Sequence, residues 1–402
     1  MGGSEGTGAR RSAPLLTSIA YTVRTEGLGW VLRRLRYRTP ATAPGRAVHA
    51  FLRRGLGAVL MPARRLRRSV EGAFPLSADA LYAFYDLQVA PITFDASWFA
   101  AGAELERRRQ GLRHIHFVVV PGKKDGLREE RVAYEAAVDT PSRLWRLHNI
   151  VIPVLTLVPT WAGYTVLPSR ETAATVRAST GKHVYPHHYE PVLPVGCHPS
   201  EILAAAREGA REMGVLRSPL QGLRFVERWA TPRLRGRRLV TITLREHLFM
   251  AGRNSNLEVW TAFARRLDAR RYFPVFVLDS ERALDPVPAP LAELEIFREA
   301  SWNAGLRMAL YESSYLNLGV NNGPLFMCAM NARTRLLVFK IITPSVPQAT
   351  EAFLRELGFD IGGQLPFATQ FQRLVWEDDT LEVIEREFEA MVSRIEAGRG
   401  AS

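Results

Sequence analysis

The sequence predicts an α/β fold in which two Rossmann-like domains face a cleft, preceded by a basic N-terminal extension. From about residue 76 onward, apolar strand-like segments alternate with amphipathic helix-like segments, and this alternation implies parallel sheets flanked by helices. At 402 residues the chain is also too long for one ordinary hydrophobic core. We therefore expect an extension over 1–75, a first domain with a linker over 76–223, and a second domain with a closing helix over 224–402.

The positive charge of the chain is concentrated in the expected extension. Residues 1–75 hold 14 Arg and no Lys against three Glu, a net charge of +11, whereas the whole chain carries +13. Residues 1–13 are rich in Gly and Ser and are expected to be disordered. Residues 14–70 interleave short apolar stretches with Arg. This pattern is typical of an amphipathic helix on an anionic membrane surface, where each basic residue contributes roughly 1 kcal/mol.

Two other interpretations of residues 14–70 stay open. An Arg-rich, acid-poor start is also typical of an organelle transit peptide, and a solvated extension needs no partner. The apolar runs are too short for a transmembrane helix, and no secretory signal is evident. A nucleic-acid partner is disfavoured, because aromatic and aliphatic residues such as Trp30 suit lipid better and the rest of the chain has little net charge.

The first domain is expected to contain three strands joined by helices. The expected strands cover 81–87, 114–120 and 164–168, and the expected helices cover 96–109, about 128–138, about 141–152 and 169–178. The stretch 147–169 has no charged residue and is long enough to cross a membrane. Its three prolines would interrupt a spanning helix, so we predict a helix end, a loop and a buried strand there instead.

The linker region 182–200 is rich in Pro and His and is expected to form a loop, followed by a helix over about 200–213. Its histidines have a spacing that matches no metal-ligand pattern, so we predict no metal site. The two cysteines, Cys197 and Cys328, lie far apart in sequence and give neither a disulfide framework nor zinc spacing. This favours a reducing compartment, with each thiol acting as a small buried apolar group.

The second domain carries the most informative pattern of the chain. A strand over 239–244 runs into Arg245, and a polar loop then opens an amphipathic helix near residue 256. A strand over 273–278 ends at Asp279, another over 315–320 ends at an Asn-Asn-Gly-Pro turn, and a closing helix covers about 382–397. Because parallel sheets bind ligands at the carboxyl ends of their strands, the polar residues at these ends are candidate ligand contacts.

The candidate contacts form two groups, both suited to an anionic ligand. The first is Arg245, Arg253, Asn254 and Ser255, at a strand end and at the start of a helix whose N–H groups attract phosphate. The second is Asn321, Asn322 and Gly323, whose turn would present backbone N–H groups to a nucleotide or its sugar. The plainer interpretations are an ordinary helix cap with two solvated arginines and a turn with no special role.

Two carboxylates are candidates for a general base. Asp86 and Asp95 flank the loop that follows the first strand, and either could take a proton from an acceptor hydroxyl. Asp95 could equally cap the helix that begins at Ala96, which we consider the better explanation from sequence alone. The chain has no P-loop, nucleophile elbow or Gly-x-Gly-x-x-Gly fingerprint, which disfavours kinases, NTPases, α/β-hydrolases and standard dehydrogenases.

On these residues the chain resembles bacterial glycosyltransferases of the GT-B fold over roughly 76–397. The resemblance rests on 243–245, on 253–255 ahead of the Trp260 helix, and on 315–323 ahead of another helix. It implies that the second domain binds a nucleotide-diphosphate sugar, with Arg245, Arg253 and Asn254 on the diphosphate, and that the first domain receives the acceptor. It also implies that no tightly bound cofactor or catalytic metal is needed. The chain offers neither an Asp-x-Asp triplet nor a clear Glu-x7-Glu signature of the retaining members, which favours an inverting reaction.

The resemblance therefore predicts a glycosyltransferase that moves a sugar from a nucleotide-diphosphate donor to a cell-surface glycan or lipid-linked acceptor. Residues 14–70 would hold it at the cytoplasmic face of the membrane. Fold alone does not establish activity, so two alternatives remain. One is a different group transferase on the same scaffold. The other is a non-catalytic, membrane-associated scaffold protein that retains the fold.

Overall fold

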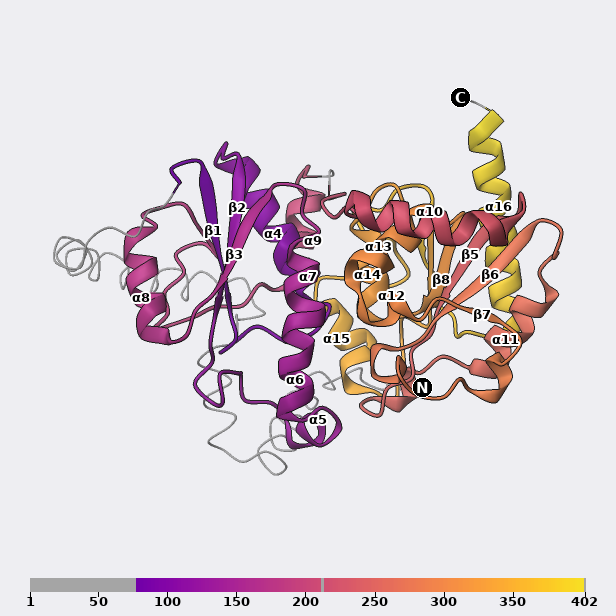
Figure 1. Cartoon of the computed structure of the whole chain (residues 1–402), viewed down its shortest axis with the longest axis horizontal. Helices are drawn as coiled ribbons and strands as arrows, with labels where there is room; N and C mark the ends of the chain where they lie inside the picture. Colours follow the sequence, from indigo (N-terminus) through magenta and orange to yellow (C-terminus); the bar gives the residue numbers. More distant parts are fainter. Residues whose placement is uncertain (1–76, 211–212, 401–402) are drawn as a thin grey trace, which may run out of the picture.

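The computed structural model describes residues 77–210 and 213–400, so the predictions for the extension lie outside the described residues. Within them the chain is α/β, with two sheets made of parallel strands and helices on both faces of each. Figure 1 shows the two sheets side by side, with helices lying between them. The expected fold class is confirmed.

The first sheet has four strands in the order β3-β2-β1-β4. These are β1 (Ala80–Asp86), β2 (His114–Val120), β3 (Trp161–Val166) and β4 (Val184–Tyr185). Alternate residues of β1 enter different hydrophobic clusters, because successive side chains of a strand point to opposite faces. One cluster includes helix α4 (Ala96–Arg109) and the other includes helix α8 (Arg170–Ser179), so β1 is buried on both sides.

The second sheet has six strands in the order β10-β9-β8-β5-β6-β7. These are β5 (Arg238–Thr243), β6 (Tyr272–Val277), β7 (Glu295–Ile296), β8 (Leu316–Val320), β9 (Leu336–Phe339) and β10 (Gln372–Leu374). Numbered by their sequence within this sheet, the strands lie in the doubly wound Rossmann order 3-2-1-4-5-6. The order reverses between β5 and β8, and such a switch point is where open parallel sheets bind ligands.

Helices cover both faces of the second sheet. Helices α10 (Leu220–Leu234) and α13 (Ala304–Ser313) share one cluster with β5 and β6, while α11 (Leu257–Arg266) and α16 (Leu381–Gly400) share the other. The cluster that joins β1 to α4 also includes α7 (Ile152–Leu155) and extends into α13 and α14 (Gly323–Ala329), so hydrophobic packing joins the two halves.

The remaining helical elements lie in connections. They are α5 (Val132–Ala137), α6 (Thr140–Arg146), η1 (Leu147–Val151), α9 (Pro199–Arg207), η2 (Ala251–Arg253), η3 (Ser280–Arg282), η4 (Ala289–Leu291), α12 (Glu299–Trp302), η5 (Pro347–Ala349) and α15 (Glu351–Glu356). The sequence prediction has no counterpart for helices α10, α12, α13 and α15 or for strands β4, β7, β9 and β10. Strand β4 lies inside the expected loop over 182–200.

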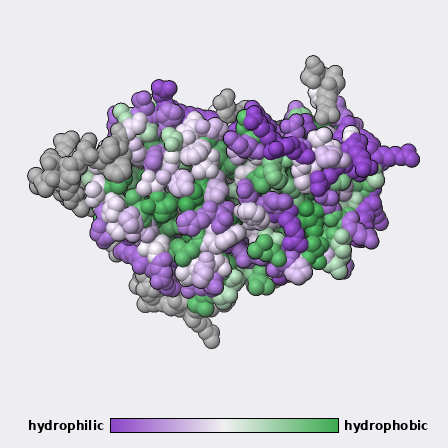
Figure 2. All heavy atoms as spheres, viewed as in Figure 1, coloured by the Kyte–Doolittle hydropathy of each residue, from purple (hydrophilic) through white to green (hydrophobic). Residues whose placement is uncertain are grey.

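The uncharged stretch 147–169 differs from its prediction in two ways. The helix continues to Leu155 through the π-helical turn η1. Pro153 follows that turn and lies in the first turn of α7, where its missing N–H costs little. The strand after it is an exposed sheet edge and not a buried strand: Trp161, Tyr164 and Val166 are all more than 40% exposed. Figure 2 shows apolar residues gathered on the surface where β3 lies. Across the described residues, no helix has the length and apolarity to span a bilayer.

Gly319 sets how closely β8 approaches β5 at the switch point. A Cβ at this position would lie 2.3 Å from the carbonyl oxygen of its register partner Thr243. Because that oxygen belongs to the backbone, it can yield only if the strands separate. We expect Gly319→Ala to destabilise the protein by about 1–3 kcal/mol, as overpacking does, measured as a lower urea midpoint.

The matched control is Gly196→Ala, whose added Cβ would meet nothing closer than 3.7 Å. It should leave the midpoint almost unchanged. Equal midpoints for the two variants would show that the contact between β5 and β8 is not tight.

Candidate functional site

The switch point brings together both groups of predicted contacts. Strand β5 leads into Arg245, and strand β8 leads into Asn321 and Asn322. The Arg253 Nη2 donates a hydrogen bond to the backbone carbonyl of Asn321 at 3.0 Å, which joins segments 68 residues apart in sequence. The loop after β5 and the turn after β8 are therefore in contact.

Arg245 is folded into its own loop. Its Nη1 donates to the carbonyl oxygen of Met250 at 3.0 Å and to the Asn254 side chain, and its Nη2 donates to the Phe249 carbonyl at 2.8 Å. Ser255 closes the loop, because its Oγ accepts from the Arg245 backbone N–H and its own N–H donates to the Arg245 carbonyl, both at 2.9 Å. Arg245, Asn254 and Ser255 thus build the loop, which does not favour the predicted bidentate contact of Arg245 with a diphosphate.

Both guanidinium groups have lowered pKa values. Burial, helped by the like charge of Arg253, lowers the pKa of Arg245 to about 10. Burial also lowers the pKa of Arg253, while the charge of Asp95 acts in the opposite direction. Within the described residues neither arginine forms an ion pair with a carboxylate. Buried charges are normally paired, so two neighbouring guanidinium groups without an ion-pair partner favour an anionic ligand.

Unused hydrogen-bonding atoms lie beside Arg253. The Arg253 Nε, the Asn322 Nδ2 and the Thr343 Oγ1 are buried without a hydrogen-bond partner in the described part of the chain. Thr343 lies near the loop that carries Arg253, because its methyl group would be 3.6 Å from a Cβ added at Gly252. The Asn322 Oδ1 is already used, accepting from the Leu325 N–H at 3.0 Å as the cap of α14. Each unsatisfied buried group costs about 1–3 kcal/mol, which a phosphate could offset.

The N-terminus of α11, expected to attract phosphate, already holds an anion. The Asp379 Oδ2 accepts from the Asn256 backbone N–H at 2.8 Å and from the Trp260 Nε1 at 2.9 Å. The Lys340 Nζ lies 3.3 Å from the other oxygen of Asp379. Asn256 is the cap, as expected, through its side chain. The sequence prediction missed Asp379, which lies more than a hundred residues from Asn256 in sequence. Its carboxylate occupies the position at the start of α11 where a phosphate was expected.

The loop after β1 packs directly on the turn after β8. A Cβ added at Gly323 would lie 2.7 Å from the Phe94 Cβ. The guanidinium of Arg307 lies 5.4 Å from the Phe94 ring, and Arg307 donates to the Ser301 carbonyl at 3.0 Å. Phe94 is therefore fixed by the second half, and the next residue, Asp95, is placed beside Arg253.

Asp95 occupies the N-cap position of α4, but its side chain makes no capping hydrogen bond. It is exposed, and in the described residues its carboxylate accepts no hydrogen bond and forms no ion pair. Its charge nevertheless reaches Arg253 and the phenol of Tyr85, whose pKa is raised mainly by burial and also by Asp95. The capping hydrogen bond that the sequence favoured is therefore absent, and the lone pairs of the carboxylate are unused within the described residues.

Asp86 is in the opposite situation. Its two oxygens accept from the Arg170 guanidinium at 2.8 and 3.0 Å, from the Tyr189 hydroxyl, and from the Gln88 backbone N–H at 2.8 Å. The residue is only 1% exposed. A buried carboxylate with four hydrogen bonds has no lone pair left for an acceptor proton, so Asp86 is a structural anchor at the end of β1 and not a free base.

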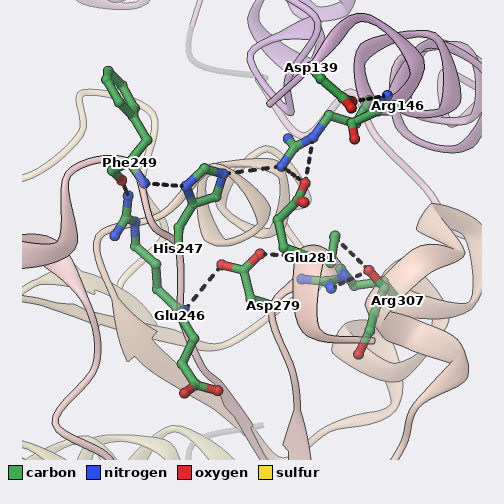
Figure 3. Close-up of polar contacts among 12 residues, drawn as sticks. Asp139, Arg146, Glu246, His247, Phe249, Asp279, Glu281 and Arg307 are labelled. Carbon is green, nitrogen blue, oxygen red and sulfur yellow. Dashed lines mark hydrogen bonds and ion pairs between the residues drawn. The ribbon is translucent and has the colours of Figure 1, made fainter. Parts of the chain in front are cut away.

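A second connection between the halves involves residues that the sequence prediction passed over. Figure 3 shows Arg146, at the end of α6, reaching across to Glu281 and His247. The Arg146 Nε donates to the Glu281 Oε1 at 2.8 Å. Nearby, the rings of Tyr134 and Phe249 meet edge to face, with centroids 5.2 Å apart. Nothing in the local sequence of α6 marks Arg146 among so many arginines, because its partner lies 135 residues away.

The histidines of residues 182–200, for which no metal site was predicted, contact other residues of the chain. His183 bonds to Gln110, His198 caps α9, and the rings of His187 and His188 lie against each other. In the described ranges, no three His, Cys, Asp or Glu side chains gather closely enough to hold a metal. A cavity of about 310 Å³ lies between the start of β3, α7 and the α12–α13 junction, and none of the predicted site residues lines it.

No protein-family model matches the chain, and no curated protein matches its sequence. Among solved structures, the glycosyl transferase family 9 protein from Veillonella parvula DSM 2008 is similar at 10% identity, over 67% of this chain and 82% of that one, with a TM-score of 0.45. The E. coli ADP-heptose LPS heptosyltransferase II is similar at 10% identity over 87% and 82%, with a TM-score of 0.34. The wall teichoic acid polymerase TagF is similar at 8% identity over 86% and 92%, with a TM-score of 0.30. The resemblance to GT-B-type glycosyltransferases is thus one of fold alone.

Proposed function

We propose that this protein is a glycosyltransferase that uses a nucleotide-diphosphate sugar as donor and transfers the sugar to an acceptor hydroxyl with inversion. The observation that carries the proposal is the geometry at the switch point. The buried Arg245 and the half-buried Arg253 form no ion pair in the described residues, and the Arg253 Nε and the Asn322 Nδ2 are buried without a hydrogen-bond partner there. Asp95, in the loop after β1, makes no capping hydrogen bond, and its charge acts on Arg253.

Arg253 and Asn322 would hold the diphosphate. Both carry a buried N–H donor without a partner, and a diphosphate offers acceptor oxygens for each. Arg245 would add a fixed positive charge while its donors hold the loop. Negative charge grows on the diphosphate as the bond to the sugar breaks, and these preorganised donors would stabilise it without a metal ion.

Asp95 would serve as the general base. It would take the proton of the acceptor hydroxyl while that oxygen attacks the anomeric carbon from the side opposite the departing diphosphate. One bond forms as the other breaks, so the configuration at that carbon inverts. The donor is a substrate, and the reaction as proposed requires no tightly bound cofactor.

The acceptor is proposed to be a cell-surface glycan or lipid-linked saccharide at the cytoplasmic face of a membrane. The support is the sequence of residues 14–70, whose arginines and apolar stretches suit an anionic bilayer. Co-sedimentation of the full chain with vesicles tests this part. Binding that needs anionic lipid and weakens with salt is expected, and equal retention by neutral vesicles would contradict it.

A second candidate function has its own support. Arg245 and the N-terminus of α11 are satisfied within the chain, as in a scaffold protein that kept the fold and lost the chemistry. A different group transferase would also use the same anion site. The scaffold predicts no binding of any nucleotide, and the other transferase predicts nucleotide binding with a donor other than a sugar.

The deciding experiment is the loss of donor binding in Arg253→Ala. We expect the wild type to bind at least one of UDP, GDP, ADP and CDP by calorimetry, and the variant to bind it about 10- to 100-fold more weakly, because a charge-assisted contact to phosphate is lost. The control is Arg265→Ala, which removes an exposed guanidinium whose hydrogen bond in the described part of the chain goes to the Pro290 carbonyl. Absence of nucleotide binding in the wild type, or equal loss in both variants, would contradict the proposal.

A further inference from the structure

Asp279 occupies a position that the sheet topology makes informative. It directly follows β6, which lies beside β5 on the side away from β8. In the 3-2-1-4-5-6 order, β5 is the first strand and β6 the second. In doubly wound sheets of this order, the pyrophosphate lies at the turn after the first strand, and an acidic residue at the end of the second accepts hydrogen bonds from ribose hydroxyls.

The carboxylate of Asp279 is held in place with acceptor capacity to spare. Its Oδ2 accepts from the Glu246 backbone N–H and its Oδ1 from the Glu281 backbone N–H, both at 3.2 Å (Figure 3). A carboxylate offers about four lone-pair sites, so each oxygen can accept again. The residue is half-buried, and in the described part of the chain no cation forms an ion pair with it.

Asp279 follows its strand at the same edge of the sheet as the proposed diphosphate contacts. Strands β5 and β6 pair in register up to Thr243 and Val277, and the Leu244 N–H donates to the Val277 carbonyl at 2.9 Å. The segments that follow β5 and β6 therefore leave the sheet at the same level, and the two strands lie about 4.8 Å apart. The negative charge of Asp279 also partly counters the lowering of the Arg245 pKa by burial, as expected for neighbouring groups.

We infer that Asp279 accepts hydrogen bonds from the 2′ and 3′ hydroxyls of the donor's ribose, so that the site takes ribonucleoside diphosphates in preference to 2′-deoxyribonucleoside diphosphates. This inference rests on the proposed function, because it needs the diphosphate to lie between β5 and β8. The nucleoside then extends over β5 and β6. The uncharged sugar separates the carboxylate from the phosphates, so the two negative groups are not in contact.

The test compares three probes on the full chain by calorimetry. The probes are the ribonucleoside diphosphate that the wild type binds, its 2′-deoxy form, and inorganic pyrophosphate. We expect the wild type to bind the ribonucleotide about tenfold or more tightly than the deoxynucleotide, because a hydrogen bond to a charged acceptor is lost. Asp279→Asn should bind both nucleotides with similar affinity and should bind pyrophosphate as the wild type does.

The matched control is Asp285→Asn, which changes an exposed carboxylate six residues away that pairs with Arg282 at 2.8 Å. It should keep the preference for ribose. Equal binding of the two nucleotides by the wild type, or a preference that survives in Asp279→Asn, overturns the inference. The wild-type comparison decides the matter even if the variant does not fold. Pyrophosphate binding without ribose discrimination removes this inference alone, whereas failure to bind every probe removes the proposed function with it.

Discussion

Replacing Asp95 with Asn is expected to lower turnover by about 10²- to 10⁴-fold, the usual contribution of a general base, while nucleotide affinity stays the same. The amide keeps the size of the side chain but cannot take a proton from the acceptor hydroxyl. Asp95 caps nothing, so α4 loses no hydrogen bond and stability should not change. The measurement is the release of nucleoside diphosphate from the nucleotide sugar that the wild type binds, together with the Kd of the nucleotide.

The control for this experiment is Asp139→Asn in the same half of the chain. Asp139 does cap its helix, with the Ser142 N–H donating to its Oδ1 at 2.8 Å, and Asn caps about as well. Its turnover should match the wild type. Turnover of Asp95→Asn within about twofold of the wild type would rule out Asp95 as the base.

Replacing Asp86 with Ala is expected to destabilise the fold by about 3–5 kcal/mol, because it leaves the Arg170 guanidinium in a largely buried place without its carboxylate. The buried Tyr189 hydroxyl loses its acceptor in the same change. The effect is one of stability, so the urea midpoint should fall with an unchanged slope. The Asp86 substitution is thus predicted to lower stability and the Asp95 substitution to lower turnover, although the two residues are only nine positions apart.

An exposed ion pair in the same half provides the comparison. Arg109 pairs with Glu106 at 2.6 Å on the surface of α4, and its side chain is 62% exposed. Arg109→Ala should cost no more than about 1 kcal/mol, as surface pairs usually do. If Asp86→Ala cost as little as this, the anchor role would be wrong and Asp86 would return as a candidate base.

Much of the architecture follows from the sequence, because strand and helix patterns are local. The strand over 239–244, the turn at 321–323 and the loop at 253–255 were all recognisable from apolar runs that end in polar residues. Parallel strands place their carboxyl ends at one edge, so Arg253 and Asn321 could be expected to lie near each other. The short strands β4 and β10 could not be predicted, because two or three residues carry too little periodicity.

The residue types at the strand ends can be read from the amino-acid sequence alone: guanidinium groups, amides and two carboxylates in the loops of parallel sheets. Which of these groups already has a partner depends on the folded chain. Asp86 meets Arg170 from 84 residues away, and Asp379 reaches the start of α11 from 123 residues away. The physical reason is that a hydrogen bond or ion pair satisfies a group wherever its partner comes from, and such long-range partners are set by strand order and packing, which no local pattern encodes.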